Sequence, residues 1–130
     1  MSQQDDVRSQ MFKQEILDGI LTYARAEGVE LSRKQADTAY NGLIHTVAEA
    51  LAQGRRVNFI KFGSLEVRHR PERPSWDMHR KKMVTRPPHN YVYFGVGTSL
   101  NKMIQNVRFK PQEQNGKVRY LVEGTESDSN

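Results

Sequence analysis

At 130 residues the chain has the length of one domain, with some length left for an arm or a tail. Only 36% of its residues are hydrophobic, which is low for a self-sufficient globule and favours a core shared with a partner. No apolar run approaches the roughly 20 residues that cross a membrane, and the polar, acidic start predicts no signal peptide. With no cysteine, the chain has neither a disulfide framework nor a thiolate nucleophile.

Two amphipathic helices are expected first in the chain. Residues 10–27 carry apolar side chains at helical spacing. Ser32 is a candidate N-cap with Gln35 at the capping-box position, and the helix that follows is expected to run to Gln53, just before Gly54. Because the link between the two helices is short, we expect a helical hairpin with one apolar face to cover.

From Val57 onward the hydrophobic period changes to the alternation that is typical of strands. We expect two short strands around a tight turn at Gly63. Farther along, "MVTR" and "YVYF" read as two more strands, separated by a pair of prolines. A last short helix is expected from about Thr98, with Val107 on its apolar stripe.

The residues after this last helix are mostly polar. "VRF" and "VRYLV" flank an Asn115-Gly116 turn signal, which predicts a small hairpin, and the final "EGTESDSN" has the composition of a disordered end. We therefore expect one folded domain over residues 10–106, preceded by a flexible extension at residues 1–9 and followed by a C-terminal extension at residues 107–130.

The excess positive charge is concentrated in one segment. Residues 68–86 hold seven basic residues against two acidic ones, while the rest of the chain carries thirteen of each. Such a focused patch is typical of a surface that binds a polyanion, although a solvated loop would have the same composition. Within this segment, residues 70–82 show neither a helical stripe nor a clean alternation, and they surround the only tryptophan of the chain.

No catalytic or metal-binding motif emerges from the sequence. The four histidines lack the spacing of metal ligands, and there is no G-x-S-x-G nucleophile elbow. The run "FGVGTS" at residues 94–99 lacks the lysine of a phosphate-binding loop, so its glycines are better explained by a junction between a strand and a helix. We therefore expect no enzymatic activity, no cofactor and no metal.

The order of these features resembles the HU and integration host factor family of bacterial DNA-bending proteins. The resemblance covers roughly residues 12–106. It implies an α+β fold with an N-terminal helical hairpin, a small antiparallel sheet with a protruding β-ribbon arm at about residues 68–86, and a short C-terminal helix. It also implies an intertwined homodimer, or a heterodimer with a related subunit. The residues that carry it are Gly54, Val57, Phe62, Gly63, Ser64, the strand to Arg68 and Arg70, and Phe94, Gly97 and Leu100.

The resemblance also implies a function. The expected partner is double-stranded DNA, bound in the minor groove with little sequence preference and bent, and the expected location is the nucleoid in the cytoplasm. In this family an apolar side chain at the arm tip wedges between base pairs. The expected DNA-binding residues are Arg68, Arg70, Arg73, Trp76, Met78, Arg80, Lys81, Lys82 and Arg86.

The chain departs from the family pattern at several positions. The tip reads Ser75-Trp76-Asp77-Met78 in place of a glycine-arginine-asparagine-proline run, so Met78 stands where the wedging proline would be, and Asp77 adds a negative charge. Thr98 and Asn101 replace the lysines that are usual at the start of the last helix. These changes leave room for a second hypothesis beside DNA binding, in which the chain is an HU-fold structural part of a phage virion or similar assembly. In that case the arm and the tail would contact phage structural proteins.

Overall fold

The computed structural model describes residues 10–125 of the chain, and within them the expected α+β class is confirmed. Three helices accompany three small antiparallel sheets in that part of the chain. Two compact units divide it, one made of Met1–Leu43 with Ser99–Asn130 and the other of Ile44–Thr98. The elements are α1 (Lys13–Ala26), α2 (Arg33–Ala52), β1 (Val57–Phe59), β2 (Gly63–Arg70), β3 (Arg73–Asp77), β4 (Lys82–Arg86), β5 (His89–Val96), α3 (Thr98–Ile104), β6 (Val107–Gln114) and β7 (Lys117–Thr125).

The two expected helices form, and their N-terminal ends differ in how they are capped. The α2 helix starts with a complete capping box, in which the Ser32 N–H donates to Gln35 Oε1 at 2.9 Å and the Gln35 N–H donates to Ser32 Oγ at 3.0 Å. The α1 helix starts at Lys13, three residues later than expected, because Phe12 at its N-cap has an extended backbone and no side chain that caps the helix.

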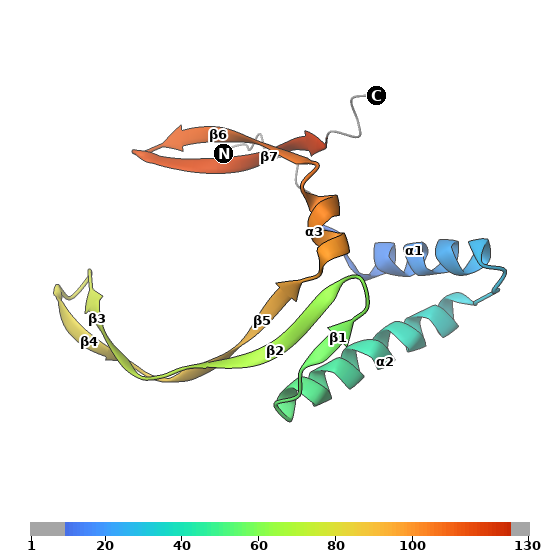
Figure 1. The fold of residues 1–130 in the computed structure, drawn as a ribbon, viewed down its shortest axis with the longest axis horizontal. Helices are drawn as coiled ribbons and strands as arrows, with labels where there is room; N and C mark the ends of the chain where they lie inside the picture. Colours follow the sequence, from blue (N-terminus) through green and yellow to red (C-terminus); the bar gives the residue numbers. More distant parts are fainter. Residues whose placement is uncertain (1–9, 126–130) are drawn as a thin grey trace. The chain divides into compact units, whose positions relative to one another are not determined.

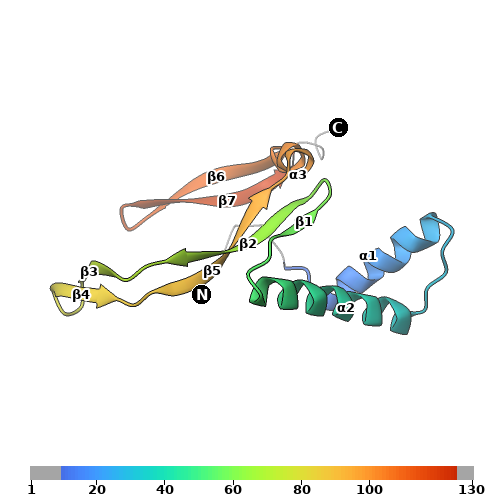
Figure 2. The same ribbon diagram turned by 60° about the horizontal axis from the view of Figure 1, so that its bottom comes forward.

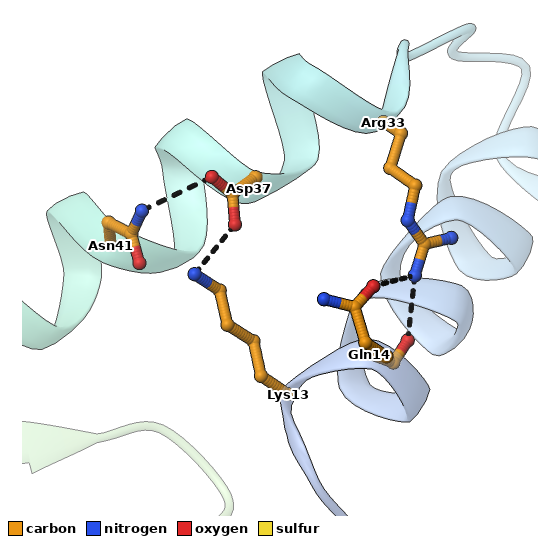
Figure 3. Close-up of polar contacts among 5 residues, drawn as sticks. All are labelled: Lys13, Gln14, Arg33, Asp37 and Asn41. Carbon is orange, nitrogen blue, oxygen red and sulfur yellow. Dashed lines mark hydrogen bonds and ion pairs between the residues drawn. The ribbon is translucent and has the colours of Figure 1, made fainter.

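Polar contacts hold α1 against the first half of α2 (Figure 3). Lys13 Nζ lies 2.7 Å from a carboxylate oxygen of Asp37, and the Arg33 guanidinium donates to Gln14 Oε1 at 2.6 Å. Because these side chains are exposed, each contact stabilises the hairpin by well under about 1 kcal/mol. Within the two helices only Leu17 and Ala36 are buried, so most of the expected apolar face is uncovered in the single chain.

The central sheet has the strand order β1-β2-β5, and the turn between its first two strands lies earlier than expected. The expected turn position, Gly63, is instead the first residue of β2, and the chain turns over residues 60–62 with Lys61 at a φ of 65°. Glycine is required at residue 63 for a different reason. Its φ is 155°, and a Cβ there would lie 2.5 Å from the carbonyl oxygen of Gly95 on the neighbouring strand.

The basic segment forms a ribbon in two parts. β2 and β5 continue into the separate two-stranded sheet of β3 and β4, as Figures 1 and 2 show. The pairing stops between Arg70↔His89 and Arg73↔Arg86. At this interruption Pro71 and Glu72 on one strand lie across the ribbon from Pro87 and Pro88 on the other. Residues 70–82 show no clean alternation in the sequence, yet β3 occupies five of them despite Pro74.

The C-terminal part of the chain contains α3 and the predicted hairpin. Val107 was expected on the helix, but α3 ends at Ile104 and Val107 is the first residue of β6. The hairpin is longer than predicted: β7 extends to Thr125, so Gly124 and Thr125 of the expected disordered end are paired. The expected flexible extension at residues 1–9 and the end of the chain at residues 126–130 lie outside the described residues.

Candidate nucleic-acid interface

The inner part of the ribbon, β2 with β5, carries arginines and tyrosines on one face. Directly paired residues share a face of the sheet, and side chains alternate along each strand. The pairs Glu66↔Tyr93 and Arg68↔Tyr91 therefore lie on the same face, and Arg70 follows them on it. The opposite face is apolar, with the pairs Leu65↔Phe94 and Val67↔Val92.

Arg68 is held in place by its neighbours on that face. Its Nε donates to Glu66 Oε2 at 2.7 Å, and its guanidinium lies 3.6 Å from the centre of the Tyr93 ring. The hydrogen bond from Arg68 lowers the pKa of Glu66, and the same bond raises the pKa of Arg68. Arg68 is therefore oriented within the protein and its charge is partly balanced, unlike the charges of Arg70, Arg73 and Arg86.

The interruption of the ribbon, which we call the elbow, contains a cavity lined by cationic residues. The cavity has a volume of about 510 Å³, and Arg70, Arg73 and Arg86 reach it from both parts of the ribbon together with His89. Among the described residues none of the three arginines has an ion-pair partner, although the Arg70 guanidinium lies 5.1 Å from the Tyr91 ring. Three guanidinium groups around one cavity without a balancing carboxylate form a site for an anion.

The outer part of the ribbon, β3 with β4, presents apolar side chains. Trp76 pairs directly with Met83, so the two side chains share a face, and they are 50% and 58% exposed. Met78 is 74% exposed but lies in the turn beyond the end of β3. The strand alternation therefore does not extend to Met78, and the cross-strand partner of Trp76 is Met83.

Asp77 closes the turn at the tip. Its Oδ1 accepts hydrogen bonds from the backbone N–H groups of His79 at 2.9 Å and Arg80 at 3.2 Å, and its Oδ2 lies 3.7 Å from Arg80 Nε. Lys81 takes the left-handed conformation with a φ of 53°, and Lys82 pairs across the ribbon with Asp77. The acidic residue that departs from the family pattern thus shapes the turn that carries three basic residues.

The structure brings the expected site residues onto one ribbon, but in three groups. Arg68 lies on the inner part, three arginines lie at the elbow, and the remaining residues lie on the outer part and its tip. Sequence reasoning missed Tyr91, Tyr93, Met83 and the turn-closing role of Asp77. The alternation of "YVYF" against "LEVRHR" could have paired the tyrosines with the arginines.

The described residues 10–125 offer no second kind of site. They contain no cluster of three or more histidine, cysteine, aspartate or glutamate side chains that could hold a metal ion. None of the helices in that span is long and apolar enough to cross a membrane.

A family model described as "Bacterial DNA-binding protein" matches residues 11–105. The chain therefore belongs to this family of bacterial DNA-binding proteins. Within it, the chain is a divergent member of the HU group, as its individual relatives show.

Two similar proteins are both called DNA-binding protein HU. The one from Thermotoga maritima is 28% identical over 95 residues, which cover 73% of this chain and 100% of that protein. The one from Clostridium pasteurianum is 32% identical over 84 residues, which cover 65% of this chain and 92% of that protein.

A solved structure described as an Anabaena HU–DNA cocrystal structure has a similar fold. The TM-score is 0.63 at 26% sequence identity, and the similarity covers 72% of this chain and 97% of that one. The family match ends at residue 105, before β6 begins at Val107, so the C-terminal hairpin lies beyond it.

Proposed function

We propose that this protein is a non-enzymatic, architectural DNA-binding protein that bends duplex DNA. It acts as a dimer, and the ribbon of β2–β5 and β3–β4 is the arm that follows the minor groove. Membership of a DNA-binding family and similarity to an HU chain crystallised with DNA support the choice of ligand. Binding with little sequence preference is expected, because the arm offers mainly arginine and lysine for phosphates rather than side chains that read bases in the major groove.

The observation that carries the proposal is the elbow. Arg70, Arg73 and Arg86 line a cavity of about 510 Å³ that no acidic side chain lines, and none of the three forms an ion pair among the described residues. A ligand with one negative charge would leave this site with a net positive charge, whereas a nucleic-acid backbone presents several negative charges to it in succession. The elbow therefore suits a backbone that passes between the two parts of the arm.

The tip supplies the apolar part of the proposed mechanism. A wedge must be apolar to enter a base stack, while cationic neighbours hold the arm on the backbone. Met78 extends from the turn, Trp76 lies one residue before Asp77, and Arg80, Lys81 and Lys82 surround them. Unstacking one base step costs about a few kcal/mol, which the additional contacts with bent DNA offset.

The dimer is proposed because the single chain leaves most of its apolar surface uncovered. Among the described residues only Leu17, Ala36 and Leu121 are buried apolar residues. The apolar face of β2 and β5 borders a groove of about 530 Å³ against the last turns of α2, and Val92 in that groove is 54% exposed. A second copy is the occupant that fits, because an apolar surface distributed over helix and sheet alike is the pattern of a core completed by an identical chain.

A charged residue in that surface tests the dimer. Leu43 lies in the middle of α2 and is 51% exposed in the single chain. We expect Leu43→Glu to cause loss of the cooperative thermal transition, because dimer contacts and core are the same surface. Light scattering and circular dichroism at micromolar concentration measure this. A stably folded monomer, from the variant or the parent, would disprove the dimer.

DNA binding itself is tested by a gel shift with random-sequence duplex at two salt concentrations, run beside light scattering for the size of the assembly. We expect binding that weakens steeply with salt, by about 0.9 in log K per unit of log salt for each phosphate contacted. Failure of the parent to bind random duplex at low salt would contradict the proposal.

A second function has one observation in its favour. Trp76, Met78 and Met83 form an exposed apolar group at the tip, and aromatic and methionine side chains are enriched at protein interfaces. In that case the chain is a structural protein of a phage virion or similar assembly. A large assembly that is stable at high salt and free of DNA would favour this function over the first.

A further inference from the structure

The C-terminal hairpin of β6 and β7 has a precisely defined pairing. Asn115 and Gly116 at its turn have φ values of 53° and 77°, and two consecutive positive φ values are the signature of the type I′ turn that fits a two-residue hairpin. The turn therefore fixes which residues face each other from Gln114↔Lys117 outward.

This register separates charged from apolar side chains. One face carries the pairs Phe109↔Val122 and Pro111↔Tyr120, which are apolar, and the pair of Glu113 with Val118. The opposite face carries every basic residue of the hairpin, with no acidic residue paired among them. We call each cross-strand pair on that face a row. The rows, from the turn outward, are Gln114↔Lys117, Gln112↔Arg119, Lys110↔Leu121 and Arg108↔Gly124.

Each row of this face contributes one cation, and we call the set of four the basic stripe: Lys117, Arg119, Lys110 and Arg108. Successive rows are two residues apart, or about 6.8 Å. The stripe is therefore a line of four positive charges about 20 Å long. One strand of duplex DNA carries a negative charge about every 3.4 Å along the helix axis, so the stripe has the length of about six base pairs.

The stripe is largely exposed, and one acidic residue lies near its end, because Glu123 is the unpaired bulge residue next to Gly124. Arg108, Lys117 and Arg119 are exposed, and Lys110 is half-buried. None of the four takes part in an ion pair among those residues. Leu121 lies on the same face and is only 3% exposed, and Lys110 opposite it is half-buried, so the accessible charges are chiefly those of Arg108, Lys117 and Arg119.

Gly124 helps to place the outermost charge. A Cβ at this position would lie 3.3 Å from Arg108 Nη2, so the guanidinium occupies the space next to Gly124 that a side chain would fill. The bulge at Arg108 and Phe109 leaves the outermost row intact.

We propose that the basic stripe is a second contact surface for duplex DNA, separate from the arm. It rests on the proposed function, since it assumes that the arm brings the protein to DNA. It binds the phosphate backbone without reading sequence, because four aliphatic cations and two glutamines on a flat ribbon offer charge but no groove-shaped set of base contacts. The hairpin lies beyond the residues that match the family, so this contact would be an addition to the family's arm.

The test compares charge removal from the stripe with equal charge removal elsewhere. The double variant Lys117→Gln with Arg119→Gln, and the variant with all four stripe residues changed to Gln, are compared with the parent. The matched control is Arg25→Gln with Lys34→Gln, which removes two exposed positive charges from the helices. Circular dichroism checks that the exposed substitutions leave the fold intact.

Affinity for random duplex is measured over a range of salt concentrations. We expect the slope of log K against log salt to fall in magnitude by about two for the double variant and about four for the quadruple variant, and to stay near the parent value for the control. An equal loss in the control would show that net charge rather than the stripe matters, and would overturn the inference.

Other outcomes are distinguishable from failure of the proposed function. If the stripe variants bind like the parent while Arg70→Ala with Arg73→Ala binds weakly, the inference is wrong and the proposed function stands. If the parent does not bind duplex at all, the proposed function fails. If the parent, but not the quadruple variant, prefers poly-glutamate to duplex of equal charge, the stripe is a surface for acidic protein and the inference is wrong.

Discussion

The outer arm and the C-terminal hairpin are both two-stranded antiparallel ribbons, yet they arrange their charges differently. In the outer arm the cations gather at the two ends, at the elbow and at the tip, and the rows between carry Ser75↔Val84 and Trp76↔Met83. In the hairpin each row of one face carries one cation, and the apolar residues other than Leu121 lie on the other face.

Their turns differ in the same way. The turn of the arm is closed by the Asp77 side chain, which accepts from two backbone N–H groups, while that of the hairpin needs only the backbone of Asn115 and Gly116. Similar backbones thus carry different charge patterns, because the register decides which side chains share a face. Clustered cations with an apolar tip suit a wedge that deforms a duplex, and an even stripe suits a surface that only lies along one.

The largest expected effect is the loss of the elbow arginines. Arg70→Ala with Arg73→Ala should lower duplex affinity by about a hundredfold near 0.1 M salt and reduce the salt slope by about two, since each lost phosphate contact removes about 0.9. Gel shifts over a salt series measure both, with Arg25→Ala and Lys34→Ala as the control. Normal binding by the arginine variant would mean that the arm does not contact DNA.

The tip variants should separate bending from binding. Trp76→Ala and Met78→Ala each remove an exposed apolar side chain without changing charge. We expect each to reduce the bend angle while changing affinity by less than about tenfold, because the wedge costs about as much in unstacking as it recovers in contacts. Fluorescence transfer between the ends of a short duplex measures the bend. If both variants bend DNA by the same angle as the parent, neither side chain acts as a wedge.

Changing the hairpin turn should weaken one ribbon and leave the other intact. Gly116→Val places a β-branched side chain at a φ of 77°, which costs about 1–3 kcal/mol locally. Hydrogen exchange should therefore accelerate in β6 and β7 while protection in β2 and β5 is unchanged. If exchange accelerated equally in both, the two ribbons would not be independent in stability.

The smallest effect concerns Glu66 on the inner arm. Its pKa lies below the usual 4.5 because of the hydrogen bond from Arg68. The ionised Glu66 therefore stabilises the folded protein fully above about pH 4.5, and this stabilisation is lost as the pH falls through the lowered pKa. We expect Glu66→Gln to make the melting temperature less dependent on pH below about 4.5. If the melting temperature depended on pH in the same way for parent and variant between pH 3 and 7, this assignment would be contradicted.

The sequence predicted the elements that local chemistry decides. The capping box at Ser32 and Gln35, and the Asn115-Gly116 turn, are set by residues within a few positions of each other, and both were found where expected. The helix and strand ends that depend on tertiary contacts were placed less well. Gly63 was taken for a turn glycine, but it is needed because the carbonyl of Gly95 lies too close for any side chain.

The candidate site was predicted as a set of residues and not as an arrangement. Counting charge located the arm, but it could not separate Arg68, which is paired with Glu66, from Arg73 and Arg86 at the elbow. The pair of Arg68 with Glu66 is local, but the contact of Arg68 with Tyr93 and the gathering of arginines at the elbow depend on cross-strand pairing. In the same way, Asp77 looked like an unfavourable charge until its hydrogen bonds to the turn were known.

The prolines of the chain affect its tendency to aggregate. All five lie in the strands of the two ribbons or at the elbow: Pro71, Pro74, Pro87, Pro88 and Pro111. A two-stranded ribbon has two open edges, and each edge can act as a template for the strand of another molecule. Proline has no N–H to offer such a strand, so it interrupts the template without adding bulk. We therefore expect the prolines in both ribbons to oppose edge-to-edge aggregation. Replacing Pro74 and Pro111 by threonine should expose that tendency as concentration-dependent aggregation in light scattering.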